Sequence, residues 1–243
     1  MPITKIGCRW RNGFQEFYSL DGSDVEVVDV MAPIKMFHDF NGPAVDNTND
    51  FNVAAVNGGT ATSVDGFMIL LTGAADDDNV EVATDLVFQA QYGCVLEARL
   101  RSDDVLQQSY FVGFTDAITE GADLLPIDYS TGGALLTTAS DAAGFFQCSD
   151  NGADIMCGSV IANTDSTPQD TGTDAVIAAL HTYRVEIDTA GNAKYFFDGV
   201  YVGTDTLAVT TTDPLCAYVG NITRHGSANT VDVDYIRAWG GRQ

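Results

Sequence analysis

Apolar and polar residues alternate most clearly between residues 183 and 197. Residues 183–188 read Tyr-Arg-Val-Glu-Ile-Asp, so every second side chain is apolar, and this period of two predicts a half-buried strand. Gly191 and Asn192 follow, and both residue types tolerate the positive φ of a tight turn. Residues 194–197, Lys-Tyr-Phe-Phe, alternate again. The segment is therefore predicted to be an antiparallel hairpin whose inward-facing side chains are Tyr183, Val185, Ile187, Tyr195 and Phe197.

Short apolar runs of the same kind recur along most of the chain. Clusters of Asn, Asp, Gly and Thr, which favour turns, separate them. The runs predicted to be strands are residues 37–40, 66–72, 86–90, 94–100, 110–114, 144–148, 183–188, 194–197, 201–202, 215–219 and 231–239. Together they predict an all-β fold, a two-sheet antiparallel jelly-roll sandwich. No segment shows a helical apolar period over more than about two turns, and residues 173–180 are the best candidate for a short helix.

The first 35 residues differ from the rest of the chain. They are rich in aromatic and basic residues near the start, and the regular strand pattern begins only after them. We therefore expect an N-terminal arm over residues 1–35 and one sandwich domain over residues 36–243. No apolar run approaches the roughly 20 residues that cross a bilayer, and residues 1–8 lack the apolar stretch of an export signal. We therefore expect no membrane partner and no exported form.

The formal charge of −23 is unevenly distributed. Residues 102–183 contain no Lys or Arg and twelve Asp or Glu residues. Direct binding of nucleic acid is disfavoured, because phosphate contacts require Lys and Arg. Aspartate outnumbers glutamate by 28 to 6. Because the short Asp side chain favours turns and Glu favours helices, this bias supports the all-β prediction.

The first eleven residues have the opposite charge, with Lys5, Arg9 and Arg11 and no acidic residue. Positive charge and aromatic rings suit an anchoring contact with an acidic partner surface. The residues predicted to bind a partner are Arg9, Trp10, Arg11, Phe14 and Phe17. The expected partner is a larger assembly, or neighbouring copies of this chain in a trimer or dimer. Two alternatives stay open: an edge strand added to the sandwich, and a basic terminus without a binding role.

The five cysteines form neither a C-x-x-C pair nor a Cys/His spacing suited to a metal ion. Cys94 and Cys216 lie in apolar runs and are predicted to be small core residues. Cys148 and Cys157 bracket a Ser-Asp-Asn-Gly turn, and a disulfide between them is left open. Free thiols in a reducing cytoplasm are the default expectation.

Several segments, taken in order, resemble a known family. They are Phe37-His-Asp-Phe-Asn-Gly, Glu97–Arg101, Phe111–Asp116, the hairpin of residues 181–199 and Val233–Ile236. The chain resembles the concanavalin A-like lectin/glucanase jelly roll, in the laminin-G-like form found in bacteriophage virion proteins. The resemblance covers residues 36–239 and its motifs are structural. It implies that the first and last strands of the fold, residues 37–40 and 233–239, lie side by side.

The resemblance also allows a test for glycosidase chemistry. Glucanases of this fold that resemble laminarinases carry Glu-x-Asp-x-x-Glu, or a one-residue variant, on a concave-face strand, which sets two carboxyl groups about 5 Å apart. The one candidate here is Glu186-Ile-Asp188, which lacks the second Glu. Glu81, Glu97 and Glu120 each stand alone in the sequence. We therefore predict no catalytic residue and no enzyme activity.

Metal and sugar sites are not predicted either. Asp76-Asp-Asp-Asn79 and Asp103-Asp104 offer oxygen ligands, but they lack the alternating spacing that surrounds one ion. We therefore expect no metal site and no cofactor beyond the weak calcium binding of acidic turns. A sugar site needs an aromatic platform, whereas Trp10 lies in the arm and Trp239 is expected in the core. His38, His181 and His225 are far apart in the sequence, and the two that lie on predicted strands or strand starts are interpreted as structural.

These features together suggest a non-enzymatic virion structural protein. The expected role is a bacteriophage capsid decoration or head-associated protein that is made in the host cytoplasm, located in the virion and anchored through its N-terminal segment. Its partners would be other virion proteins, such as the major capsid protein. The alternative is a lectin-like adhesion or receptor-binding protein that binds a glycan. A divergent glycoside hydrolase is the third hypothesis.

Overall fold

The computed structural model describes residues 6–11, 14–19, 34–41, 45, 51–121, 124–130 and 132–241, the first two ranges by their backbone only. The described residues form two large antiparallel sheets, as the sequence predicts. The β9 sheet, named after its central strand, has the order β14 (Thr164–Asp165), β13 (Asp154–Ile161), β12 (Ala142–Cys148), β9 (Gln108–Thr115), β19 (Cys216–Thr223), β7 (Asn79–Ala83) and β4 (Asn52–Ala55), and β15 (Gln169–Asp174) pairs with β13. The β8 sheet has the order β18 (Val200–Asp205), β17 (Ala193–Phe197), β16 (His181–Ile187), β8 (Cys94–Ser102), β20 (Thr230–Gly240), β6 (Phe67–Leu71) and β5 (Thr60–Val64), and β3 (Ile34–His38) pairs with β20.

The remaining elements are short. Two hairpins form sheets of their own: β1 (Ile6–Arg11) with β2 (Phe14–Ser19), and β10 (Ile127–Tyr129) with β11 (Leu135–Thr137). Two 3-10 turns, η1 (Ala90–Tyr92) and η2 (Ser149–Asn151), interrupt the connections. Among the described residues, no helix has the length and hydrophobicity needed to span a membrane.

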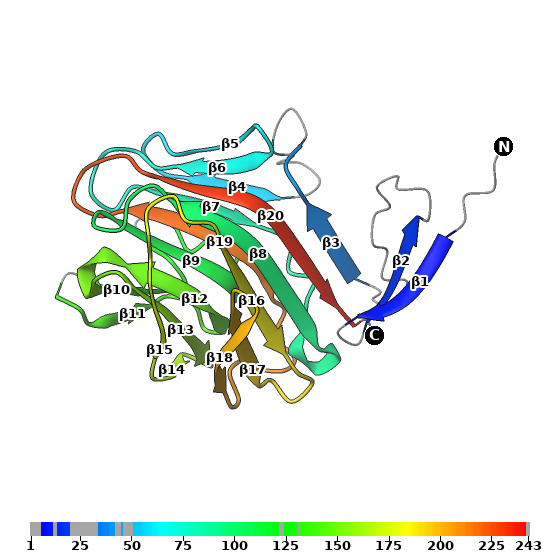
Figure 1. Ribbon diagram of the computed structural model, residues 1–243. Helices are drawn as coiled ribbons and strands as arrows, with labels where there is room; N and C mark the ends of the chain where they lie inside the picture. Colours follow the sequence, from blue (N-terminus) through cyan, green and yellow to red (C-terminus); the bar gives the residue numbers. More distant parts are fainter. Residues whose placement is uncertain are drawn as a thin grey trace.

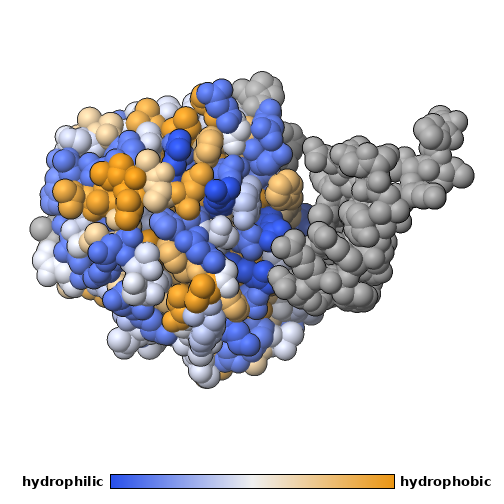
Figure 2. Space-filling view, viewed as in Figure 1, coloured by the Kyte–Doolittle hydropathy of each residue, from blue (hydrophilic) through white to orange (hydrophobic). Residues whose placement is uncertain are grey.

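The two sheets pack face to face and enclose the main hydrophobic core (Figure 1). The hairpin of β16 and β17 lies as predicted, because Tyr183, Val185, Ile187, Tyr195 and Phe197 are all buried in this core. The polar residues of β16 point to the other side of the sheet. Seen from the same direction, the surface of the sandwich mixes hydrophobic and hydrophilic residues (Figure 2).

The first and last strands of the sandwich pair with each other, which confirms the expectation drawn from the resemblance. β3 runs antiparallel to β20, and Met36 lies opposite Ala238. The boundary expected after residue 35 falls inside β3, which begins at Ile34. β20 therefore has β3 and β6 along one edge and β8 along the other.

Two predicted elements are wrong. Residues 173–180 do not form a helix: β15 ends at Asp174, and Ala178 takes a positive φ of 62° while its N–H donates to Ser102. Residues 86–90 do not form a strand. Phe88 makes only an isolated bridge to Leu215, after which η1 begins. In both places a local turn, held by backbone hydrogen bonds to another strand or loop, outweighs the apolar pattern.

The four described cysteines are free and buried. Cys94 lies in the main core and Cys216 in a second apolar cluster, as small apolar residues do. The bridge left open between Cys148 and Cys157 does not form. Cys157 lies between the two sheets, whereas Cys148 belongs to the cluster on the outer face of the β9 sheet. A disulfide cannot join two strand residues that point to opposite faces of a sheet.

The outer face of the β9 sheet carries this second hydrophobic cluster. Phe111, Phe146 and Tyr218 project from the sheet and pack against residues of the segment before and within β10, including Leu125 and Ile127. Glycines make room for this packing: a Cβ at Gly144 would lie 2.5 Å from Cζ of Phe111, and one at Gly220 would lie 2.6 Å from Cδ2 of Leu125. Residues 124–130 and 132–139, here called the covering segment, therefore cover this face.

Candidate functional site

The predicted partner-binding residues all fall on β1 and β2. The register pairs Arg9 with Glu16 and Arg11 with Phe14. Trp10 lies opposite Gln15, and Phe17 lies opposite Cys8. The two strands pair with each other, so neither is an edge strand of the sandwich. The side chains of Arg9, Trp10, Arg11, Phe14 and Phe17 lie outside the described part of the chain, so their role stays a prediction.

The candidate acidic pair Glu186 and Asp188 is divided between two structural tasks. Glu186 lies on the outer face of β16 and forms an ion pair with Arg184. Asp188 follows the strand and closes the turn, because its Oδ1 accepts hydrogen bonds from the N–H groups of Ala190 (2.9 Å) and Asn192 (3.0 Å). Partial burial acts to raise the pKa of Asp188, but these bonds and the Asn192 amide lower it overall.

A carboxyl pair that the sequence does not indicate lies under the segment covering the β9 sheet. Glu81, on β7, accepts hydrogen bonds from the N–H of Glu120 (2.8 Å) and from Nδ2 of Asn79 (2.7 Å). Glu120 accepts from the hydroxyls of Thr115 (2.8 Å) and Thr138 (2.9 Å). Glu81 and Glu120 stand alone in the sequence, and their separation of 39 residues hides the contact that the fold brings about.

Burial controls the protonation of this pair. Glu81 is 1% exposed, and burial raises its pKa to about 7. Burial also raises the pKa of Glu120. Because both carboxyl groups already bind donors of the protein, their arrangement joins β7 to the covering segment. The pair can hold a proton near neutral pH, but its acceptor atoms are engaged inside the molecule.

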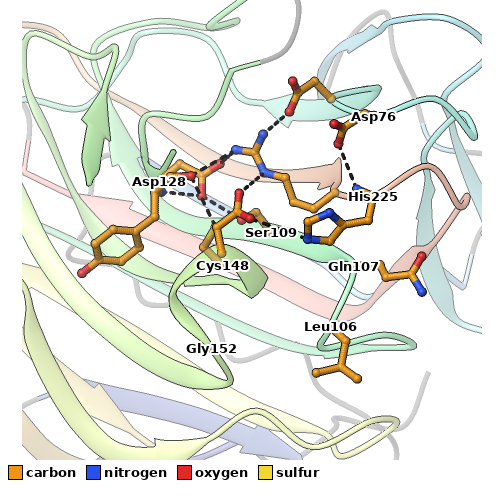
Figure 3. Close-up of polar contacts among 12 residues, drawn as sticks. Asp76, Leu106, Gln107, Ser109, Asp128, Cys148, Gly152 and His225 are labelled. Atoms are coloured by element: carbon orange, nitrogen blue, oxygen red, sulfur yellow. Dashed lines mark hydrogen bonds and ion pairs between the residues drawn. The ribbon is translucent and has the colours of Figure 1, made fainter. Parts of the chain in front are cut away.

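A second polar cluster centres on Arg224, directly after β19 (Figure 3). Its guanidinium group forms ion pairs with Asp77 and Asp128, and its Nε lies 3.8 Å from Asp150. Asp128 also accepts hydrogen bonds from the hydroxyl of Ser109 (2.7 Å) and from the N–H of Tyr129 (2.8 Å). One buried cation thus joins the loop before β7, the hairpin strand β10 and the turn η2.

The carboxyl groups of the acidic turns considered as calcium ligands are also engaged in contacts within the molecule. Asp76 accepts from the N–H of His225, Asp77 pairs with Arg224, and Asp78 accepts from Ala75 and Asn57. Asp103 accepts from the N–H of Thr230 at the start of β20, and Asp104 accepts from the N–H groups of Leu106 and Gln107 in its own loop. Within the described ranges, no group of three or more His, Cys, Asp or Glu residues is placed to hold a metal ion.

The three histidines lie in separate places. His38 Nδ1 accepts from the N–H of Phe40, His181 contacts Asp198, and His225 lies 3.6 Å from Asp150. Each takes part in local contacts, in agreement with the structural interpretation.

The outer face of the β8 sheet, from β3 to β18, forms what we call the aromatic–arginine face. One row of cross-strand neighbours crosses six strands and reads Phe37, Arg237, Glu97, Arg184, Phe196 and Tyr201. Glu97, at its centre, is buried and contacts Arg237 (2.7 Å), Arg184 (3.7 Å) and the hydroxyl of Tyr235 (2.7 Å). The row therefore has three charged residues of alternating sign at its centre and aromatic rings at both ends.

Trp239 belongs to the neighbouring row of this face. The prediction that it is a core residue is wrong, because it is half-buried on the outer side of β20. The guanidinium groups of Arg237 and Arg184 lie 5.5 Å and 5.6 Å from its ring centre. Cation–π contacts of this geometry hold both arginines in place. Strand alternation indicates the polar side of β16, but not that six strands contribute to one surface.

Comparison with known proteins supports the fold. No protein-family profile matches the chain, and no curated protein sequence matches it. Solved structures with the same architecture are similar to it. A β-glucanase of Bacillus licheniformis has 15% sequence identity and a TM-score of 0.59, over 86% of this chain and 98% of the glucanase. The fold is the concanavalin A-like jelly roll.

Other similar structures differ in what they do. An endo-acting O-glycanase of the human gut microbiota has 13% identity and a TM-score of 0.61, over 85% of this chain and 99% of that one. The carbohydrate recognition domain of Emp47p has 10% identity and a TM-score of 0.58, over 82% of this chain and 94% of that one. Both hydrolases and carbohydrate-binding domains thus share this fold. At such low identities the similarity establishes the fold alone.

Proposed function

We propose that the protein is a non-enzymatic structural protein of a virus particle, a bacteriophage capsid decoration or head-associated protein attached through residues 1–35. The observation that carries the non-enzymatic part is the covered outer face of the β9 sheet. Leu125 and Ile127 pack onto Phe111 and Tyr218 there, so apolar side chains occupy the surface of the sheet. A hydrolase that used the outer face of this sheet would need the face to be open, so that a polysaccharide could bind there.

The charged residues support the same conclusion. Glu186 and Asp188 are engaged by Arg184 and by the turn, and Glu81 and Glu120 by donors inside the molecule. A retaining glycosidase requires one carboxylate free to attack and a second free to donate a proton. In this chain, each candidate carboxyl group instead stabilises a strand, a turn or the covering segment.

The attachment role rests on the resemblance to virion proteins and on the separate N-terminal hairpin. β1 and β2 form a sheet outside the sandwich, which suits a segment that contacts another protein. The basic residues of this segment, on a chain of charge −23, would direct it to an acidic surface. The sandwich would then face outward, with the major capsid protein as the neighbour.

Particle composition tests this proposal. Particles of the virus that encodes the protein are purified, and their proteins are identified and counted. We expect this chain at a copy number comparable to that of the capsid subunits, and its loss from particles when its gene is deleted. Its absence from intact particles would contradict the proposal.

The second candidate is a glycan-binding protein, which the carbohydrate recognition domain among the similar structures favours. A glycan array separates the two roles. If the full chain binds one sugar class specifically and is absent from particles, these results would support the glycan-binding role.

A further inference from the structure

The basic side chains of the sandwich are concentrated on one side. Of the eleven Lys and Arg residues in the chain, six lie on the aromatic–arginine face: Lys35, Arg99, Arg101, Arg184, Lys194 and Arg237. Four acidic side chains lie among them: Glu97, Glu186, Asp232 and Asp234. This face therefore carries a small excess of positive charge on a chain whose formal charge is −23.

The opposite side of the sandwich is acidic. Residues 102–183 supply β9, β12, β13, β14 and β15 and contain no Lys or Arg. Exposed carboxyl groups gather where β13, β14 and β15 form the edge of the β9 sheet: Asp154, Asp165, Asp170 and Asp174. Local desolvation and the charges of Asp170 and Asp174 raise the pKa of Asp154, as expected for crowded carboxylates.

The aromatic–arginine face has the composition of a binding surface. Arg, Tyr and Trp are the residue types that contribute most to binding energy at protein interfaces. Phe37 and Tyr201, at the two ends of the row, are 54% and 55% exposed, and the Arg99 and Arg237 side chains are each 43% exposed. Because Trp239 and Glu97 already hold Arg184 and Arg237, docking would lose little of their conformational freedom.

We propose that the aromatic–arginine face docks on the acidic side of a second copy of this chain, so that copies associate head to tail. Contact between two acidic sides would be repelled, and contact between two aromatic–arginine faces would set two positive surfaces together. A head-to-tail contact instead brings guanidinium groups against carboxylates. Such a contact uses a different surface of each copy and builds a ring or a row. It is independent of the attachment through residues 1–35.

Sedimentation velocity of the full chain, without particles, tests the contact. At about 0.05 M sodium chloride we expect the average mass to rise above the monomer mass of 25.9 kDa as concentration increases. At about 0.5 M salt the dissociation constant should rise about tenfold or more, because salt screens a contact between exposed charges. A chain that stays monomeric up to millimolar concentration at low salt would overturn the proposal.

Two double variants locate the contact. Arg99→Glu with Lys194→Glu reverses the aromatic–arginine face, and Asp170→Lys with Asp174→Lys reverses the acidic edge. Each should be monomeric, with circular dichroism and thermal melting unchanged because all four positions are exposed or partly exposed. The matched control, Arg9→Glu with Arg11→Glu, changes the net charge as much as the first variant does. It should associate like the wild type, whether or not the N-terminal segment binds particles.

Mixing the two monomeric variants separates head-to-tail association from a symmetric contact. The first variant keeps an intact acidic edge and the second an intact aromatic–arginine face. An equimolar mixture should therefore form dimers that grow no further. A mixture that stays monomeric, or an acidic-edge variant that still associates with itself, would overturn the head-to-tail arrangement.

Discussion

At the scale of single residues, Glu81 and Arg224 are two ionisable groups that the fold buries. The carboxyl group of Glu81 is buried under the covering segment, and its pKa rises from 4.5 to about 7. Arg224 is buried among three aspartates. Both groups link the β9 sheet to loops from distant parts of the sequence. Each group should therefore make a measurable contribution to the free energy of unfolding, and electrostatics predicts whether that contribution is favourable or unfavourable.

Glu81 should make the protein less stable as the pH rises. Between about pH 4.5 and 7, the folded state holds a proton on Glu81 that the unfolded chain has released, so stability falls across this window. The free energy of unfolding should fall by at most about 3 kcal/mol across this window. Glu81→Gln should remove this pH dependence. The free energy of unfolding of the variant, relative to that of the wild type, should therefore increase from about pH 5 to about pH 8. Urea unfolding of both proteins at the two pH values measures this difference.

The matched control for this prediction is Glu186→Gln. Its carboxyl group is partly exposed and paired with Arg184, so the substitution should leave folding largely unchanged at both pH values. An identical pH dependence in wild type and Glu81→Gln would show that Glu81 is ionised in the folded protein.

Arg224 should matter far more than a surface arginine. Arg224→Met removes the cation from Asp77, Asp128 and Asp150 and leaves their charges close together. We expect a loss of about 3–5 kcal/mol in the free energy of unfolding. Arg99→Met, whose ion pair with Asp234 is solvent-exposed, should lose no more than about 1 kcal/mol. Equal losses in the two variants would refute the central role of Arg224.

At the scale of elements, the sequence indicates the strands with a clear alternation or a continuous apolar run, such as β16 and β9, and misses others, such as β7. β16 and β17 alternate because one face meets the core and the other meets solvent. β7 reads Asn-Val-Glu-Val-Ala and is buried on both faces, but the buried polar residues Asn79 and Glu81 interrupt the apolar run that such a strand usually shows. Its Glu81 meets Glu120 only because residues 116–121, 124–130 and 132–139 fold back over the β9 sheet. Long-range contacts of this kind leave no local pattern.

The covering segment depends on a close approach that glycine permits. Gly144→Ala would place Cβ 2.5 Å from Cζ of Phe111, whose ring lies across the outer face of the β9 sheet. Overpacking of this kind costs about 1–3 kcal/mol, and we expect a loss of that size in urea unfolding. Gly158, directly opposite on β13, is the matched control, since a Cβ there would meet its nearest atom at 3.4 Å. A Gly158→Ala loss as large as that of Gly144→Ala would contradict this packing.

At the scale of the whole molecule, charge is separated between the two sheets. The sequence shows the acidic interval of residues 102–183, but not that it covers one sheet while six basic side chains share the other. A sandwich with two unlike sides can contact different neighbours through each, and the proposed attachment through the N-terminal hairpin would add a third contact.

The N-terminal segment should be the part that attaches the protein to particles. Deleting residues 1–20 removes β1, β2 and the basic residues but leaves every strand of the sandwich. The truncated protein should stay folded and soluble, with thermal melting close to that of the full chain, yet fail to sediment with particles that lack the native copy. The variant Arg9→Glu with Arg11→Glu should also fail, because an acidic surface would repel it. Arg99→Glu with Lys194→Glu, which changes the net charge equally, should still bind. Binding of the truncated protein at the level of the full chain would show that the sandwich, and not the N-terminal segment, is the anchor.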